Sequence, residues 1–269
     1  MRRRFSIVST VWFAASLLAA GPQPNFVFIL GEGHGWSSTS VQMDEAVPGS
    51  KSDFVRTPNL ETLAHGGMRF ANFYAPSPRC TPSRAAILTG KSPAALHMTF
   101  VGEGRRESGG NPNGRVIAPE SSIELPMGDI TIAELLRRAG YATAHFGKWH
   151  VGRVSPSQHG FDESDGATNN GGPDNAANPH PRQLYGMSER GLTFMARQVK
   201  AGKPFYLQLS HYASRQGGDA TPVALAAVKA WGGNLGEREL AEAAADFDLD
   251  LAFGLVLRKL DELGIANPT

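Results

Sequence analysis

Three predicted strands, separated by stretches with helical periodicity, constrain the fold most strongly. They are Asn25 to Leu30, Tyr141 to Phe146 and Pro204 to Ser210. Strands that are apolar on both sides are typical of parallel sheets whose two faces are covered by helices. The sequence therefore predicts an α/β fold in which a mostly parallel sheet is sandwiched by helices.

Local signals predict the other elements. A short strand is expected at Met68 to Tyr74, and the amphipathic helix at Ile130 to Arg138 is expected to place Ile132, Leu135 and Leu136 on one face. Residues 160–181 are rich in Gly, Asn, Asp and Pro, which indicates a long loop that either shapes a substrate entrance or is a solvated surface excursion. The remaining helices are expected at Leu60 to His65, Ser83 to Leu88, Met187 to Ala201 and Glu237 to Leu263.

Composition and the N-terminus limit the class of protein. The 269 residues are 41% hydrophobic with a formal net charge of +1, so no basic excess calls for a nucleic-acid partner. Three arginines, Arg2 to Arg4, precede the apolar stretch Phe5 to Ala20, which predicts a signal peptide over residues 1–20 and a periplasmic or secreted protein. The alternative is a retained N-terminal anchor, although the stretch is short for a stable membrane span.

Cys80 is the single cysteine of the chain. An exported protein cannot use one thiol for an internal disulfide, so Cys80 is either a small buried hydrophobic residue or a reactive group. Its neighbours favour reactivity. Pro82 suits the first turn of a helix, whose start offers unpaired N–H groups to an anion, and Arg79 and Arg84 add positive charge.

The run from Cys80 to Arg84, followed by Leu88-Thr89-Gly90, resembles the C-x-P-S-R and L-T-G motifs of type I sulfatases, within the alkaline-phosphatase-like superfamily. Other segments resemble the family in the same order. The resemblance identifies residues 24–269 as a sulfatase N-terminal catalytic domain. The further segments are Pro24 to Leu30, Thr57 to Leu60, Gly147 to Gly152 (G-K-W-H-x-G) and Pro204 to Ala213.

The resemblance implies a reaction. In the family, a formylglycine-generating enzyme converts the motif cysteine to formylglycine, an aldehyde whose hydrate carries two hydroxyls. One hydroxyl attacks the sulfur of a sulfate ester and expels the alcohol. The other hydroxyl then loses its proton, and the adduct collapses to the aldehyde and releases sulfate. The implied function is a sulfuric ester hydrolase that acts on a sulfated polysaccharide or a sulfated small molecule.

Residue roles follow by position. Arg84 would hold the hydrate and sulfate oxygens, Lys148 would contact the sulfate, and His150 would orient the hydrate or accept its proton. Many sulfatases place a second histidine where this chain has Arg215. An arginine cannot act as a general acid near neutral pH, but it could bind an anionic substrate, as could His211 nearby.

The metal motif departs from the family pattern. The family run I-L-A-D-D-L-G-W corresponds here to Ile29 to Trp36, in which Glu32 keeps a carboxylate and Gly33 has no side chain. The resemblance implies a divalent cation, calcium, with Glu32 and the residue at Cys80 as its ligands from this chain. Calcium takes six to eight oxygens, and the family's later Asp-Asn pair would follow Thr269, so we expect a truncated chain that is inactive alone.

Two other functions stay open. The departures at Gly33 and Arg215 favour a catalytically degenerate homologue that binds sulfated glycans without hydrolysis. A phosphatase or phosphodiesterase of the same wider fold would need a hydroxyl nucleophile, for which Thr81 is adjacent, but the intact cysteine motif favours a sulfatase.

Overall fold

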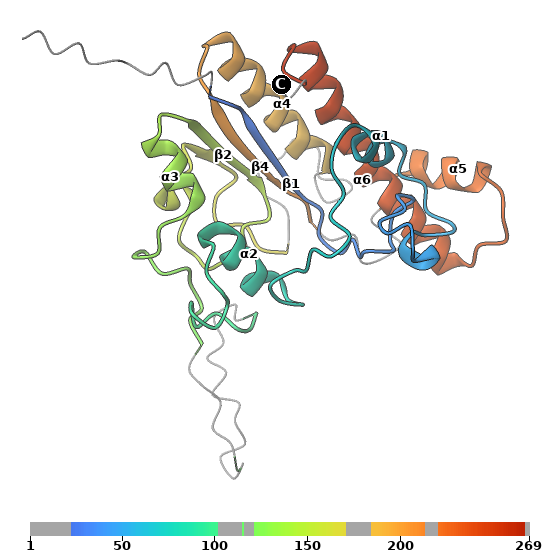
Figure 1. Cartoon of the computed structure of the whole chain (residues 1–269), viewed down its shortest axis with the longest axis horizontal. Helices are drawn as coiled ribbons and strands as arrows, with labels where there is room; N and C mark the ends of the chain where they lie inside the picture. The colour runs from blue at the N-terminus through green and yellow to red at the C-terminus, as the bar shows by residue number, and fades with distance from the viewer. Residues whose placement is uncertain (1–22, 102–114, 116–120, 171–183, 213–219, 267–269) are drawn as a thin grey trace, which may run out of the picture.

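The computed structural model describes residues 23–101, 115, 121–170, 184–212 and 220–266. Its four strands form one parallel sheet in the order β1-β4-β2-β3, with β4 between β1 and β2 (Figure 1). The sheet confirms the predicted α/β class. The strands are β1 (Phe26–Leu30), β2 (Ala142–Gly147), β3 (Glu163–Ser164) and β4 (Phe205–Ser210).

Six α-helices accompany the sheet in the described residues, and five of them coincide with the predicted helices. The unpredicted one, α5, begins after Thr221, whose side chain accepts a hydrogen bond from the backbone N–H of Ala224. The helices are α1 (Pro58–Gly66), α2 (Cys80–Thr89), α3 (Ile132–Arg138), α4 (Leu184–Lys200), α5 (Pro222–Ala230) and α6 (Glu237–Glu262), with 3₁₀ turns at Pro48–Ser50 and Pro156–His159.

Side chains of β4 alternate between two hydrophobic clusters on opposite faces of the sheet. Phe205, Leu207 and Leu209 join the cluster that α4 and α6 cover. Tyr206 points the other way, into the cluster shared with α2 and α3. Figure 1 shows the same layers, with α4 and α6 on one side of the strands and α2 and α3 on the other. Both faces of β4 are therefore covered, as is typical of a parallel sheet.

The strand predicted at Met68 to Tyr74 is wrong. The segment forms turns and irregular structure, and Phe73 and Tyr74 are 80% and 81% exposed. Its alternating apolar residues fit a strand, but a strand forms only against a partner, and no described strand pairs with this one.

The buried face of α3 also differs from the prediction. Ile132 and Leu135 are 39% and 55% exposed, whereas Ala133 is fully buried and Leu136 packs against the cluster around α2. A capping box fixes the helix start: Thr131 accepts the N–H of Glu134, and the Glu134 carboxylate accepts the N–H of Thr131. The cap sets the helix rotation, and with it the side that faces the core.

The carboxyl ends of three strands meet at one edge of the sheet. Ser210 at the end of β4 is in register with Leu30 of β1 and with Gly147 of β2. The chain segments that follow these strand ends therefore lie next to one another. Open α/β sheets bind their ligands at this edge. No helix of the described residues is long and apolar enough to cross a membrane.

Candidate active site

Cys80 is the first residue of α2 and faces the loop that follows β1. It is half-buried, and its thiol donates a hydrogen bond to Oε1 of Glu32 at 3.3 Å. Pro82 lies in the first turn of α2, and the helix closes at Gly90, which has φ 69° and donates its N–H to the carbonyl of Ala86. The helix thus begins at the cysteine, three residues before the predicted start at Ser83, and keeps Pro82 in its first turn and Gly90 at its end as expected.

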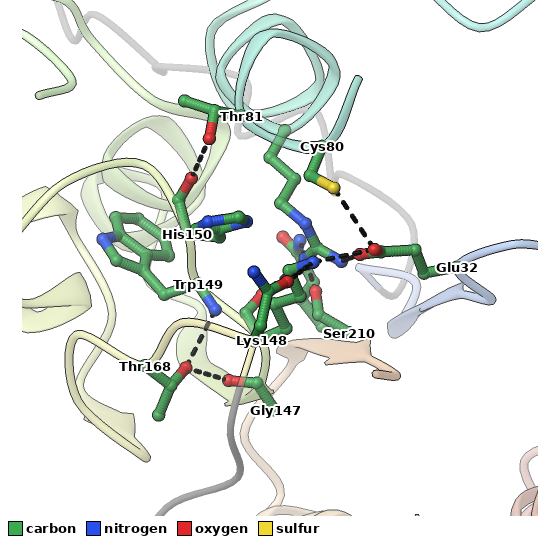
Figure 2. Close-up of polar contacts among 12 residues, drawn as sticks. Glu32, Cys80, Thr81, Gly147, Lys148, Trp149, His150, Thr168 and Ser210 are labelled. Carbon is green, nitrogen blue, oxygen red and sulfur yellow. Dashed lines mark hydrogen bonds and ion pairs between the residues drawn. The ribbon is translucent and has the colours of Figure 1, made fainter. Parts of the chain in front are cut away.

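Glu32 bridges two buried cations. Its Oε2 accepts from Nη2 of Arg84 at 2.6 Å, and its Oε1 accepts from Nζ of Lys148 at 2.7 Å. Arg84 lies one helical turn after Cys80 and is only 4% exposed, and Lys148 is 1% exposed. Arg84 also donates to the carbonyl of Lys148. Figure 2 shows Cys80, Glu32 and Lys148 converging from three separate chain segments.

The charges around Glu32 control its protonation. Burial alone would raise the pKa of the Glu32 carboxyl, but the charge of Arg84 and the hydrogen bond and charge of Lys148 outweigh it and lower the pKa to about 2. Burial lowers the pKa of the Arg84 guanidinium, and the charge of Glu32 opposes that shift. Glu32 is therefore ionised near neutral pH and serves as counter-ion to both cations.

Gly147 lets the chain turn sharply from β2 into the site. It has φ 97°, and a Cβ atom there would lie 2.2 Å from the carbonyl oxygen of Ser210. Three residues on, His150 also has a left-handed backbone, with φ 56°, and its imidazole is buried. Its carbonyl accepts a hydrogen bond from the hydroxyl of Thr81 at 2.8 Å, which ties this loop to α2 (Figure 2).

Two residues of the 160–181 segment support the site, and sequence reasoning missed both. Thr168 donates from its hydroxyl to the carbonyl of Gly147 at 2.6 Å and accepts the N–H of Trp149 at 2.9 Å. Asn170 accepts a hydrogen bond from Nζ of Lys148 at 2.7 Å. The described part of this segment is therefore neither a solvated excursion nor an entrance alone, because it holds the lysine in place. The remainder, 171–181, lies outside the described residues.

A cavity of about 1030 Å³ opens beside Cys80. Its wall includes the loop after β1 and the exposed segment before α2, so the cysteine is reachable from outside. The two arginines on this wall have different partners. Arg84 is paired with Glu32, whereas the guanidinium of Arg79 lies over the ring of Phe100, 5.3 Å from the ring centroid. The cavity combines apolar walls with an excess of positive charge, which suits an organic anion.

The described geometry brings together four of the predicted site residues, Glu32, Cys80, Arg84 and Lys148. The sequence model of the family described as Sulfatase matches residues 24–269. The chain belongs to the sulfatase family.

Relatives of this sulfatase chain include characterised enzymes. It is 31% identical over 290 residues to N-acetylgalactosamine-6-sulfatase of Mus musculus, a match that covers 95% of the chain and 51% of that protein. It is 38% identical over 157 residues to arylsulfatase A of Bos taurus, covering 56% of the chain and 26% of that protein. The chain thus spans about half the length of the mouse relative.

The fold agrees with the family. The crystal structure of Ps i-CgsB in complex with k-i-k-neocarrahexaose has a TM-score of 0.65 and 20% sequence identity, covering 90% of this sulfatase chain and 56% of that chain. At that identity the likeness establishes the fold alone, which is the alkaline-phosphatase-like fold that the sequence motifs predict.

Sulfatases generally use a divalent cation, but the described residues do not fit one. Glu32 is the one carboxylate among the described residues that line the cavity, and both its oxygens already accept from Arg84 and Lys148. Position 33 has no side chain, and the sulfur of Cys80 is a poor donor for calcium. In the described part of the chain, no group of three or more His, Cys, Asp or Glu residues could hold a metal ion.

The two predicted substrate-binding residues have different outcomes. Arg215 lies outside the described residues. His211 follows β4, is fully buried against the ring of Phe253 at 5.4 Å, and does not line the cavity. Burial lowers the pKa of His211 to about 3, so its imidazole is neutral. Its contact with substrate stays a prediction that this burial does not favour.

A second unpredicted pair involves His34, which lines the cavity. His34 directs Nε2 to Oδ1 of Asp246 of α6 at 3.1 Å, which fixes the loop after β1 to that helix. The backbone at Gly31 also lies close to this helix, because a Cβ there would be in ordinary van der Waals contact with Leu249 and Phe253 at 3.5 and 3.6 Å. The sequence offered no signal for this pair, because 212 residues separate its members (246 − 34).

Proposed function

We propose that this chain carries the catalytic cysteine of a sulfuric ester hydrolase, which acts on sulfate esters through a formylglycine made from Cys80. The observation that carries the proposal is that Cys80 begins a helix at the mouth of a cavity, with the buried cations Arg84 and Lys148 both linked to Glu32 beside it. A sulfate ester gathers negative charge on its leaving oxygen as the S–O bond breaks, and cations fixed in advance stabilise that charge.

Each residue has a proposed role. The formyl hydrate supplies the attacking hydroxyl and the means to release sulfate. Arg84 orients the residue at position 80, because one helical turn separates them, and Lys148 binds a sulfate oxygen while Asn170 fixes its ammonium group. His150 would orient the hydrate from the loop that Thr81 anchors.

The substrate class that we propose is a sulfated glycan. The mouse relative is named for N-acetylgalactosamine 6-sulfate chemistry, and the fold neighbour Ps i-CgsB was solved with a hexaose. The cavity of about 1030 Å³ has room for sugar rings next to Cys80. An aryl sulfate is the simplest probe of the reaction itself, because it releases a coloured alcohol regardless of the natural sugar.

Maturation and export belong to the same proposal. A formylglycine-generating or sulfatase-maturing enzyme would modify Cys80, and residues 1–20 would direct the protein to the periplasm or outside the cell. The support for export is the arginine-led apolar stretch, which lies outside the described residues. N-terminal sequencing of the exported protein tests it: cleavage near Ala20 is expected, and an intact N-terminus would contradict it.

The second candidate is a homologue that binds sulfated glycans without cleaving them. The missing side chain at position 33 and the lack of a metal-ligand group in the described residues favour it. The protein coexpressed with a formylglycine-generating enzyme separates the two candidates. Release of inorganic sulfate from sulfated glycans or a model aryl sulfate, lost in Cys80→Ala, supports the hydrolase. Glycan binding by calorimetry without any sulfate release supports the binder.

A further inference from the structure

Glu32 stands where the resemblance predicts a cation ligand, yet its contacts are those of a counter-ion. Its two oxygens lie 2.6 Å from Nη2 of Arg84 and 2.7 Å from Nζ of Lys148. Both cations are almost fully buried, so neither can exchange this partner for bulk water. Arg84, Lys148 and Glu32 together carry a net charge of +1.

A divalent cation on Glu32 would meet these charges at close range. It would have to take carboxylate oxygens that now neutralise a buried guanidinium and a buried ammonium, and it would leave both beside two further positive charges. No second carboxylate among the described cavity-lining residues offsets that charge, and Gly33, which follows Glu32, has no side chain.

The other charges on the cavity wall also favour an anion. Among the described wall residues, Glu32 is the single acid, against Arg79, Arg84 and Lys91. Lys91 is partly exposed and pairs with Asp129 outside the wall, so it does not compete for Glu32. The unneutralised charge of the cavity is therefore positive without any bound metal ion.

We infer that Arg84 and Lys148 bind a sulfate group without a divalent cation, and that Glu32 is an internal anion which competes with sulfate for these two residues. This inference rests on the proposed function for the identity of the ligand. It departs from the metal role that the resemblance implies for Glu32. The carboxylate keeps the two cations close together in the empty site, and an incoming sulfate oxygen shares their hydrogen-bond donors.

Sulfate binding to the purified 269-residue protein tests the inference, with binding measured by calorimetry and by the rise in melting temperature. Titrations are made at constant ionic strength with chloride as the control anion, in three conditions: untreated, with a chelator, and with added calcium. The expected result is a sulfate Kd that agrees within about twofold in all three. Loss of binding with chelator, restored by calcium, would overturn the inference, and so would no binding at all.

Variants locate the binding and test the competition. Glu32→Gln removes the competing charge at nearly constant shape, so sulfate affinity is expected to rise roughly fivefold or more. Lys148→Met is expected to abolish binding, whereas Lys91→Met, which removes a cavity charge outside the triad, is expected to stay within about twofold of the parent. Weaker binding in Glu32→Gln would contradict the competition. The chelator comparison needs no variant, so it holds even where a variant fails to fold.

Failure of this inference differs from failure of the proposed function. Metal-independent sulfate binding without sulfate ester hydrolysis by the matured protein would sustain the inference and reject the hydrolase. Hydrolysis accompanied by calcium-dependent sulfate binding would support the hydrolase and reject the inference of metal-independent binding.

Discussion

The thiol of Cys80 lies 3.3 Å from the carboxylate of Glu32, although 48 residues separate them in the chain. The contact joins the start of α2 to the loop after β1, and the same carboxylate reaches Lys148 from the loop after β2. Three segments thus meet at one ionised group. Cys80 of this sulfatase chain is therefore part of a charged network at the sheet edge, and not of the hydrophobic core.

Gly147→Ala is expected to destabilise the chain severely. A methyl group at this position would lie 2.2 Å from the carbonyl of Ser210, and φ 97° is unfavourable for alanine. We expect a loss of more than ~3 kcal/mol in the free energy of unfolding, or insoluble protein. Gly128→Ala is the control, because a Cβ there meets nothing within 4 Å, and its urea unfolding curve should match the parent.

Thr168→Val is expected to loosen the loop that carries Lys148 and His150. The substitution removes a hydroxyl that donates to Gly147 and accepts from Trp149, leaving both buried backbone groups without that partner. The expected cost is about 2 kcal/mol in urea unfolding. Thr193→Val on the exposed side of α4 also removes a hydroxyl, which bonds only to the carbonyl of Glu189, and should cost well under half as much. Equal costs would mean that Thr168 does not organise the site.

Lys148→Met is expected to lower kcat for aryl sulfate hydrolysis by about 10²-fold in the matured protein, because it removes a cation placed where negative charge develops. The reduced rate should persist at saturating substrate. Lys91→Met also removes one positive charge, from the wall of the cavity beside Cys80, and its kcat should stay near the parent value because Lys91 pairs with Asp129. A similar loss in both variants would point to general electrostatic attraction of substrate.

Acid should destabilise the parent chain through Glu32. Its folded-state pKa is lowered from 4.5 to about 2, so the ionised carboxylate contributes stability that is present above pH 4.5 and lost as the pH falls towards 2. The shift corresponds to ~3 kcal/mol at most. Unfolding free energies of the parent and Glu32→Gln, measured at several pH values, should therefore converge as the pH falls through this range. A difference between them that stays constant would contradict the low pKa.

Sequence patterns predicted what depends on neighbours in the chain. The alternation of strand and helix patterns predicted the buried strands, and Pro82 with Gly90 predicted a helix here, although α2 begins three residues before the predicted start at Ser83. Arg84 and Lys148 were predicted as site residues because they occupy positions in motifs that resemble those of sulfatases.

Other features depend on partners that the sequence does not reveal. The strand expected at Met68 to Tyr74 is missing because no described strand pairs with it. Asn170 and Thr168 lie in a stretch without periodicity, and their hydrogen bonds to the loop after β2 form only once β2 and β3 pair. Likewise, the position of Glu32 in the sequence suggested a metal ligand. Its short distances to Arg84 and Lys148, which only the structure provides, indicate that Glu32 is the counter-ion of these two residues.

The modification of Cys80 is the central claim, and peptide mass analysis tests it most directly. After coexpression with a formylglycine-generating enzyme, the peptide that contains Cys80 should lose mass equal to the change of its CH₂SH group to CHO, and the matured protein should gain aryl sulfatase activity that Cys80→Ala lacks. A peptide that keeps the unmodified thiol, in a folded protein exposed to an active maturing enzyme, would contradict the account.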